Sequence, residues 1–328
     1  MAHTALFDVH KELQAKMVPQ NSWDMPLFYP GGTVAEHRHT LKEASLFDTG
    51  NRSYFQITGT ALKTKLSELL LWKCDNIADG KFQENFLLRN DGSIALKLIL
   101  IPMAEDDFFV ILDQGISGSE KQFFIEKISS SLEYRELSEY FSSFALAGKN
   151  CRNYFNDITG TDIPEGCFDK VELDVEDEKF RSIVMHGKYS GVEAYEFFFN
   201  KELAPELYEL FYRNSGIEPA GIAAAESLRI EHAVPGTAEF ASAIYPDGCS
   251  YICRDISEKN SSPVLVSVNL GRNPAPCGSD VCNKSGNIIG KVCSGAFCPG
   301  INCARVWCRI NDRNLLDKVD GLFFKING

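Results

Sequence analysis

The chain has 328 residues, with 45 Asp and Glu against 33 Lys and Arg, so its formal net charge is −12. This acidic balance argues against nucleic acid and anionic membrane surfaces as partners. Hydrophobic residues make up 44% of the chain and charged residues 24%, which is typical of soluble globular proteins. No apolar run reaches the ~20 residues of a membrane helix and no signal-peptide pattern opens the chain, so we expect a cytoplasmic protein. The length predicts two or three domains.

The first residues predict an amphipathic helix, because Leu6, His10 and Leu13 recur at the spacing of one helical face. Further on, His37 and His39 form an H-x-H pattern, which on a strand would put both side chains on one face. A metal site needs further ligands, and the sequence offers none nearby. Polar histidines with ordinary hydrogen bonds are therefore expected here, and we predict no metal site.

A second unit begins near Ser53 and mixes strands with helices. Apolar runs and the turn at 90–92 predict an antiparallel sheet, and two apolar stripes at helical spacing predict two helices. The expected strands cover 54–57, 86–88, 94–101 and 108–112, and the expected helices cover 62–70 and 124–132. Two helices on one face of an antiparallel sheet form an α+β unit.

The chain has eleven cysteines, and eight of them fall in its last quarter. Cys293, Cys298, Cys303 and Cys308 recur every five residues, and on a strand an offset of five changes the face, so neighbours are expected to point opposite ways. No C-x-x-C pair occurs, which weakens both a zinc and a thioredoxin-like interpretation. We expect free thiols that serve as small buried hydrophobic groups in a reducing compartment.

One short stretch, MHGKYSGVEAYEF from Met185 to Phe197, combines a tyrosine, a turn and two carboxylates. One interpretation is a hairpin whose carboxylates are solvated. The other is a ligand pocket, since Tyr189 offers a flat apolar face with a polar tip. Glu193 and Glu196 are its candidate acceptors, because a fixed carboxylate can accept two parallel N–H bonds from a planar partner.

This stretch resembles the G-Y-T-G-E-x-G-[FY]-E box of the glycine-cleavage T-protein (aminomethyltransferase) family. It reads K-Y-S-G-V-E-A-Y-E here, with matches at Tyr189, Gly191, Tyr195 and Glu196. The resemblance implies that the box lines a pocket for the pterin ring of tetrahydrofolate. It also implies that Tyr189 and Glu196 contact that ring, so tetrahydrofolate is the expected cofactor and a folate-like small molecule the expected partner.

Other segments continue the resemblance near both ends of the chain. The family's G-W-x-M-P-x-x-Y segment matches at Trp23 and Tyr29, which become candidate ligand-binding residues. Arg52 stands where the family has a methionine that packs near folate. Asn327 stands where the family has an arginine that faces the folate site.

A helical segment, GIAAAESLRIE, resembles the family's G-x-A-R-D-x-L-R-x-E pattern. Arg229 and Glu231 match, while Ala225 replaces an arginine that in the family helps to hold the site. Arg229 and Glu231 are expected to form a structural ion pair, with a ligand-binding role for Arg229 as the alternative.

The main departure from the family lies in the segment GSIALKLI. The family pattern is G-G-x-x-D-D-L, whose second Asp is catalytic, and Lys97 stands at that position. A lysine ammonium is positively charged near pH 7 unless it is strongly desolvated, so it would oppose the cationic transfer state. At ~4 Å and an effective dielectric constant of 20 this interaction is worth about 4 kcal/mol. That would slow the transfer by more than about a hundredfold.

The resemblance runs in order through nearly the whole chain and implies an α+β fold of three domains arranged as a ring. The first is a split α+β folate-binding domain over 1–52 plus 145–236. The second is a ferredoxin-like α+β domain over 53–144. A linker over 237–262 then leads to a small C-terminal β-barrel over 263–328.

Three functions remain open on these grounds. The first is a tetrahydrofolate-dependent aminomethyl or other one-carbon transferase, with Glu193 as a candidate replacement for the missing carboxylate. The second is a pseudoenzyme that binds a folate or an anion, which Lys97 favours. The third is an interaction protein that docks a carrier such as the lipoyl protein of glycine cleavage, although an acidic carrier would be repelled by so acidic a chain.

Overall fold

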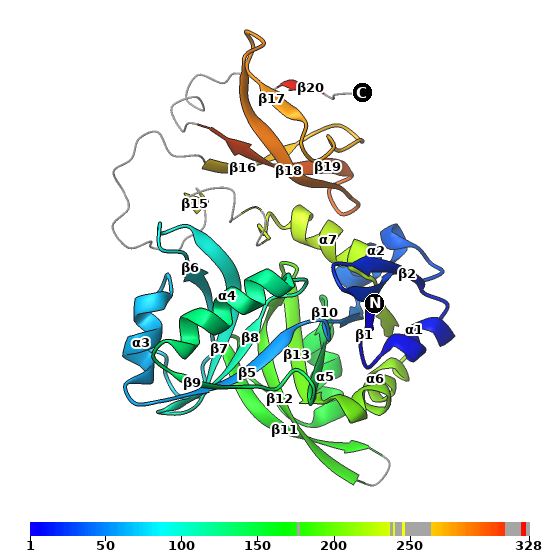
Figure 1. The fold of residues 1–328 in the computed structure, drawn as a ribbon. Coiled ribbons are helices and arrows are strands. Elements are labelled where there is room, and N and C mark those ends of the chain that lie inside the picture. The colour runs from blue at the N-terminus through cyan, green and yellow to red at the C-terminus, as the bar shows by residue number, and fades with distance from the viewer. Residues whose placement is uncertain (176–177, 237–238, 240–244, 247–263, 312–322, 326–328) are drawn as a thin grey trace. The chain divides into compact units, whose positions relative to one another are not determined.

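The computed structural model describes residues 1–175, 178–236, 239, 245–246, 264–311 and 323–325 (Figure 1). The chain forms two compact units, which combine residues 1–87 with 96–225 and residues 88–95 with 226–328. Both helices and sheets contribute to the fold, so the expected α+β class is confirmed. Among the described residues, no helix combines the length and apolar character that a membrane span requires.

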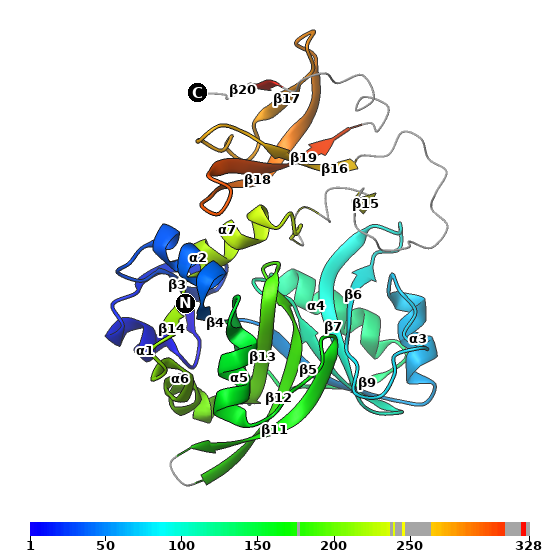
Figure 2. The same ribbon diagram turned by 180° about the vertical axis from the view of Figure 1, so that it is seen from behind.

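The first unit contains a six-stranded sheet. Its strands, in spatial order, are β11 (Cys167–Val175), β12 (Glu178–Tyr189), β13 (Val192–Asn200), β10 (Phe141–Ala147), β4 (Ala44–Asp48) and β14 (Ile217–Pro219). Figure 2 shows α5 (Cys151–Thr159) beside β13, and the rings of Phe155 and Tyr195 stack there at 3.9 Å between centroids. Burial of such apolar faces is what holds the helices on the sheet.

Helices and a small sheet complete this part of the unit. The helices are α1 (Phe7–Glu12), α2 (Thr33–Lys42), α6 (Ala204–Tyr212) and the start of α7 (Ile222–Glu231). A three-stranded sheet joins β1 (Ala2–His3), β3 (Trp23–Phe28) and β2 (Lys16–Gln20) in that spatial order. His37 and His39 lie on α2 and not on a strand, so they do not share a face. Among the described residues, no group of three or more His, Cys, Asp or Glu is placed to hold a metal ion.

The second sheet of the first unit follows the sequence prediction closely. Its strands, in spatial order, are β6 (Gln83–Leu88), β7 (Ile94–Ala104), β8 (Asp107–Leu112), β5 (Ser53–Thr58) and β9 (Glu133–Glu136). Its helices are α3 (Leu62–Leu69) and α4 (Gly118–Ser129), and both contribute to one apolar cluster on this sheet, as predicted. The other face packs Tyr54 and Ile111 against Met185 and Phe198 of the six-stranded sheet. The six-stranded and five-stranded sheets of the first unit therefore share a core.

The hairpin between β12 and β13 sets which side chains reach that shared core. Ser190 and Gly191 have φ values of +52° and +89°, so the two-residue turn has the left-handed geometry that favours glycine. The register pairs Tyr189 with Val192 and Met185 with Glu196. Paired residues point to the same face, so Tyr189, Met185 and Glu196 lie on one face of the sheet.

The second unit contains a six-stranded sheet. In spatial order its strands are β15 (Tyr245–Pro246), β16 (Val264–Asn269), β19 (Cys303–Ile310), β18 (Ile288–Cys298), β17 (Asp280–Cys282) and β20 (Phe323–Lys325). The strands from β16 to β20 lie within 263–328, the range in which the C-terminal β-barrel is predicted. The predicted linker over 237–262 lies mostly outside the described residues.

Candidate functional site

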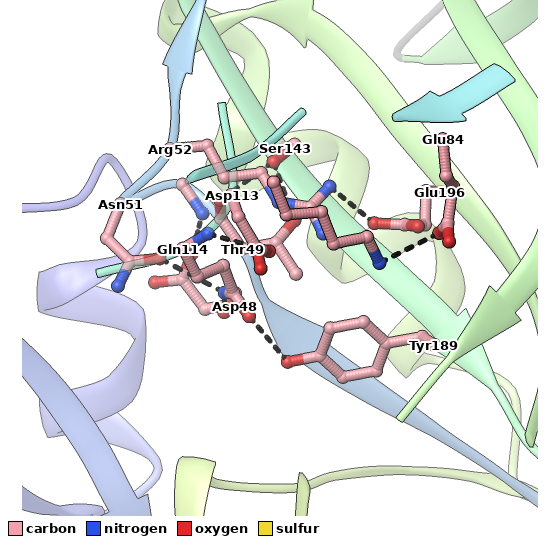
Figure 3. A network of polar contacts seen from close by, with 12 residues as sticks. Asp48, Thr49, Asn51, Arg52, Glu84, Asp113, Gln114, Ser143, Tyr189 and Glu196 are labelled. Carbon is pink, nitrogen blue, oxygen red and sulfur yellow. Dashed lines mark hydrogen bonds and ion pairs between the residues drawn. The ribbon is translucent and has the colours of Figure 1, made fainter. Parts of the chain in front are cut away.

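The stretch that resembles the family box, Lys188 to Glu196, contributes to a group of buried polar side chains in the first unit (Figure 3). Tyr189 ends β12 and Glu196 lies on β13, while Arg52 immediately precedes β5. Gln114 follows β8 and also belongs to the group, as do Lys97, Glu84 and Asp113. These side chains come from segments far apart in the sequence, and the core shared by the two sheets brings them together.

Arg52 and Glu196 form the central ion pair. Arg52 Nη1 lies 2.5 Å from Glu196 Oε2, and the side chains are only 5% and 7% exposed. Burial raises the pKa of Glu196, and the nearby guanidinium offsets this only in part. Burial alone would lower the pKa of Arg52, but Glu196 and Asp113 outweigh it and the pKa is raised. Arg52 Nε is buried and finds no hydrogen-bond acceptor among the described residues.

A second ion pair lies beside the first. Lys97 Nζ on β7 is 3.0 Å from Glu84 Oε1 on β6, with 23% of the lysine side chain exposed. Burial lowers the pKa of Lys97, but Glu84 and Asp113 outweigh it, so the pKa is raised and the ammonium stays charged. The group thus contains two cations, Arg52 and Lys97. It also contains three carboxylates, of Glu84, Asp113 and Glu196, so its formal charge is −1.

Tyr189 is held by a chain of hydrogen bonds. Its hydroxyl donates to Gln114 Oε1 at 3.0 Å, and Gln114 Nε2 donates to Asn51 Oδ1 at 3.0 Å and to the Asp48 carbonyl at 3.3 Å. One side of the ring rests against Phe47, with centroids 5.1 Å apart. Burial raises the pKa of Tyr189, so the hydroxyl stays protonated and acts as a donor. The tyrosine ring is thereby fixed in one orientation near the ion pairs.

Comparison with known proteins shows which family the chain resembles. Residues 6–242 match the family described as the GCVT N-terminal domain. The chain belongs to this family. An aminomethyltransferase of Natranaerobius thermophilus is 23% identical over 322 residues, which cover 92% of this chain and 88% of that relative. An aminomethyltransferase of Chloroherpeton thalassium is 26% identical over 322 residues, covering 91% and 88%. The resemblance to aminomethyltransferases is thus confirmed, at low identity.

A solved structure supports the fold of this GCVT-family chain. The crystal structure of glycine cleavage system aminomethyltransferase T from Bartonella henselae matches with a TM-score of 0.81 and 23% identity. The match covers all of this chain and 94% of that protein. At this identity the likeness concerns the fold, and the chemistry has to be argued from the side chains.

Tyr29 and Trp23, the candidates from the first segment of the GCVT chain, lie apart from the ion pairs. The Tyr29 hydroxyl lies 2.8 Å from His10 Nδ1, and His10 Nε2 lies 2.8 Å from Asp48 Oδ2. Tyr29 is buried, and His10 on α1 links it to Asp48 on β4. Trp23 lies on β3, opposite Ala2 and Gln20.

Glu193 does not join the group around Tyr189. It lies three residues from Glu196 on the same strand, so its side chain points to the opposite face of the sheet. There Glu193 Oε1 is 2.9 Å from His186 Nε2, and 40% of the side chain is exposed. The expectation that Glu193 contributes a carboxylate to this pocket is therefore wrong.

Arg229 belongs to the second unit of the GCVT-family chain and makes local contacts. Its Nη2 lies 2.6 Å from Glu226 Oε1 and 2.9 Å from Glu239 Oε1. Glu231 Oε2 instead accepts a hydrogen bond from Gly300 N at 2.8 Å. The structure thus gives Arg229 and Glu231 different partners and not the ion pair expected between them. Side chains two residues apart on a helix point in different directions. Asn327 lies outside the described residues.

Sequence reasoning missed three members of the group, namely Glu84, Asp113 and Gln114. A weak signal existed, since Asp113 and Gln114 directly follow a predicted strand and Glu84 precedes another. Polar residues at strand ends are common, and only the packing of the two sheets shows which of them meet.

Proposed function

We propose that this protein binds tetrahydrofolate through the group around Glu196 and does not catalyse efficient aminomethyl transfer. The observation that carries the proposal is the pair of Lys97 with Glu84 beside the pair of Arg52 with Glu196. The protein would thus bind the ligand expected for an aminomethyltransferase, but the charges of its site do not suit the transfer.

Three features support a pterin-like ring as the ligand. Glu196 is a buried carboxylate that can accept N–H bonds from an aminopyrimidine edge. Arg52 Nε is a buried donor without an acceptor among the described residues, and a ring nitrogen or carbonyl would satisfy it. Tyr189 presents an aromatic face held in place through Gln114. Acceptor, donor and flat face together match the edge and plane of one ring.

The same group argues against transfer chemistry. Tetrahydrofolate would supply the nitrogen that receives the one-carbon unit, and the passing group is cationic. The Lys97 ammonium remains charged, because Glu84 and Asp113 raise its pKa against the effect of burial. A like charge at ~4 Å costs about 4 kcal/mol at an effective dielectric constant of 20, which corresponds to a rate loss above about a hundredfold.

An anionic ligand is a poorer match. Each of the two cations already has a carboxylate partner, and the group as a whole carries one more carboxylate than cations. A lipoyl carrier protein is a further candidate partner that the family resemblance brings with it. The net charge of −12 would repel a carrier that is itself acidic.

We also propose the domain division given by the family resemblance. In support of this division, the five-stranded sheet draws its strands from 53–144, and the six-stranded sheet draws its strands from 1–52 and 145–236 except that β10 begins at Phe141. The ring arrangement and the closed C-terminal barrel remain part of this proposal.

Calorimetric titration with tetrahydrofolate tests the binding half of the proposal. We expect Glu196→Gln to weaken binding by ~1.5–3 kcal/mol, because a charge-assisted acceptor becomes a neutral one. Glu193→Gln is the matched control, since this carboxylate lies on the same strand but on the opposite face, and its affinity should stay within about twofold. Absence of binding to any reduced folate at millimolar concentration would refute the proposal.

A glycine-cleavage assay with the lipoyl carrier and tetrahydrofolate tests the second half. Turnover should lie at least about a hundredfold below that of an active aminomethyltransferase. Turnover within tenfold of the active enzyme would show that the lysine does not block the transfer.

A further inference from the structure

Four cysteines gather on the hairpin formed by β18 and β19 in the second unit. Cys293 and Cys298 lie on β18, and Cys303 and Cys308 lie on β19. Cys298 pairs directly with Cys303, with the turn at 299–302 between them. Cross-strand partners share a face, so the expectation that these two cysteines point opposite ways is wrong. The hairpin turn, which the even spacing does not reveal, is the reason.

The other two cysteines do not form an equivalent pair. The register shifts between Val292 and Ser294, so Cys293 falls in a bulge and Cys308 lies opposite Val292. Cys308 packs into one apolar cluster with Val292, whereas Cys293 packs beside Cys298 in another. Cys293 still lies close enough to Cys308 to raise its pKa, but only Cys298 and Cys303 are directly opposed cross-strand partners.

The backbone geometry at this pair suits a covalent bond. Opposed residues on antiparallel strands have Cα atoms about 4.5 or 5.5 Å apart, depending on the hydrogen-bonding class. A disulfide needs a Cα separation of about 4.4–6.8 Å, so either class falls within its range. Cys298 is fully buried, Cys303 is partly exposed, and neither forms a disulfide in this structure.

We propose that Cys298 and Cys303 form an oxidation site, at which a low-molecular-weight disulfide such as oxidised glutathione converts the two thiols into a cross-strand disulfide. The partly exposed Cys303 reacts first. Its thiolate attacks one sulfur of the small disulfide, forms a mixed disulfide and releases one small thiolate.

The buried cysteine then completes the reaction. The Cys298 thiolate attacks the Cys303 sulfur and expels the second small thiolate. The protein loses two protons and two electrons, and the small disulfide is reduced to two thiols. Burial, assisted by Glu231, raises the pKa of Cys298 to about 11, so this second step should accelerate as the pH rises.

Hydrogen bonds connect the hairpin to α7 close to Cys298 and Cys303. Gly300 N in the turn donates to Glu231 Oε2 at 2.8 Å, and Arg305 Nη1 donates to the Glu231 carbonyl. Ser227 Oγ donates to the Phe297 carbonyl at 2.8 Å. A disulfide between 298 and 303 would therefore lock the two strands at the position that holds the last turns of α7.

Differential thiol labelling of the full-length protein tests the proposal. The reduced protein is treated with oxidised glutathione, free thiols are blocked with iodoacetamide, and oxidised thiols are reduced and labelled with N-ethylmaleimide. Cleavage after Lys291 and Arg305 yields one peptide with Cys293, Cys298 and Cys303. We expect maleimide on Cys298 and Cys303 and carbamidomethyl on Cys293.

Variants separate the pair from its neighbours. Cys298→Ser should stop the reaction at a stable glutathione adduct on Cys303, and Cys303→Ser should leave Cys298 unlabelled by maleimide. Cys293→Ser is the control and should still form the pair. Because Cys303 is only partly buried, its variant keeps the test valid if Cys298→Ser fails to fold.

The outcome is decisive in each direction. Equal oxidation of Cys293 and Cys298, or a wild-type protein that stops at the glutathione adduct on Cys303, would overturn the proposal. Failure of the wild type to oxidise at high pH would do the same. None of these results depends on folate binding, so they leave the proposed function untouched.

Discussion

Arg52 Nη1 lies 2.5 Å from Glu196 Oε2, in an ion pair that is almost completely buried and that joins residues 144 positions apart. It links β13 of the six-stranded sheet to the residue that precedes β5 of the five-stranded sheet. A buried ion pair is weak evidence for net stability, because both charges lose hydration. Removing one partner is a different matter, since the other charge is left buried and alone.

Arg52→Met should therefore destabilise the protein by ~3–5 kcal/mol, measured as the free energy of unfolding in urea. The double variant Arg52→Met with Glu196→Leu should recover much of this loss, because no charge remains buried there. Arg213→Met is the control, since its ion pair with Glu209 is exposed on α6, and it should cost less than about 0.5 kcal/mol. A loss in Arg52→Met as small as in this control would contradict the argument.

Gly148 offers a second test, because it joins β10 to α5 with a φ of +136°. A Cβ there would lie 2.5 Å from the Thr40 carbonyl oxygen and 2.6 Å from that of Glu43. Gly148→Ala should thus cost about 3 kcal/mol or more, from backbone strain and overpacking combined. Gly118→Ala, whose Cβ would meet nothing within 4 Å, should change the unfolding free energy by less than about 0.5 kcal/mol.

The sequence was sufficient for local structure in the first unit. The apolar stripes at Leu62 and Leu66 and at Phe124 and Ile128 predicted α3 and α4, because a helix face repeats every 3.6 residues. The turn at 190–191 was equally readable, since serine followed by glycine tolerates two positive φ values.

The site was less predictable, because its contacts depend on register and long-range packing. Glu193 and Glu196 are chemically alike, and only the register of β12 against β13 decides which of them faces Tyr189. The partner of Tyr189 is Gln114, 75 positions away, and no local pattern announces that contact. The bulge at Cys293 likewise made the directions of the cysteine side chains unpredictable. One extra residue in a strand reverses the face of every later side chain.

Glu239 in the second unit predicts a defined pH dependence. Burial raises the pKa of Glu239, but Arg229 and the Ser294 hydroxyl outweigh it, so the pKa falls below its usual 4.5. A carboxyl group with a lowered pKa in the folded state stabilises the protein fully above the unfolded value, and this contribution disappears as the pH falls through the lowered pKa.

Glu239→Gln should therefore destabilise the protein by ~1.5–3 kcal/mol at pH 7, with the difference from the wild type shrinking below about pH 4.5. Urea unfolding of both proteins between pH 3 and 7 measures this. Glu209→Gln, which changes an exposed carboxylate, should show little difference across the range. A Glu239→Gln effect that does not change with pH would assign the contribution to packing and not to charge.

Lys97→Asp restores the residue that the family pattern has at this position. From the structure we predict that it does not restore transfer. The new carboxylate would point toward Glu84, whose Oε1 now lies 3.0 Å from Lys97 Nζ, and toward Asp113, which also raises the pKa of Lys97. A further carboxylate in a group that already has more carboxylates than cations favours protonation of one carboxyl group, and a protonated acid does not stabilise a cation.

Lys97→Asp should therefore be less stable than Lys97→Met, since the methionine removes a cation without adding a carboxylate to Glu84 and Asp113. Adding Glu84→Lys to Lys97→Asp reverses the ion pair and should recover part of the stability lost, as measured by urea unfolding. In the glycine-cleavage assay Lys97→Asp should remain at least about a hundredfold below an active aminomethyltransferase, because a misplaced or neutralised catalytic group costs about that much. Turnover in Lys97→Asp that approaches the active enzyme would show that the neighbouring carboxylates leave the new group ionised, and that this single lysine accounts for the loss of transfer.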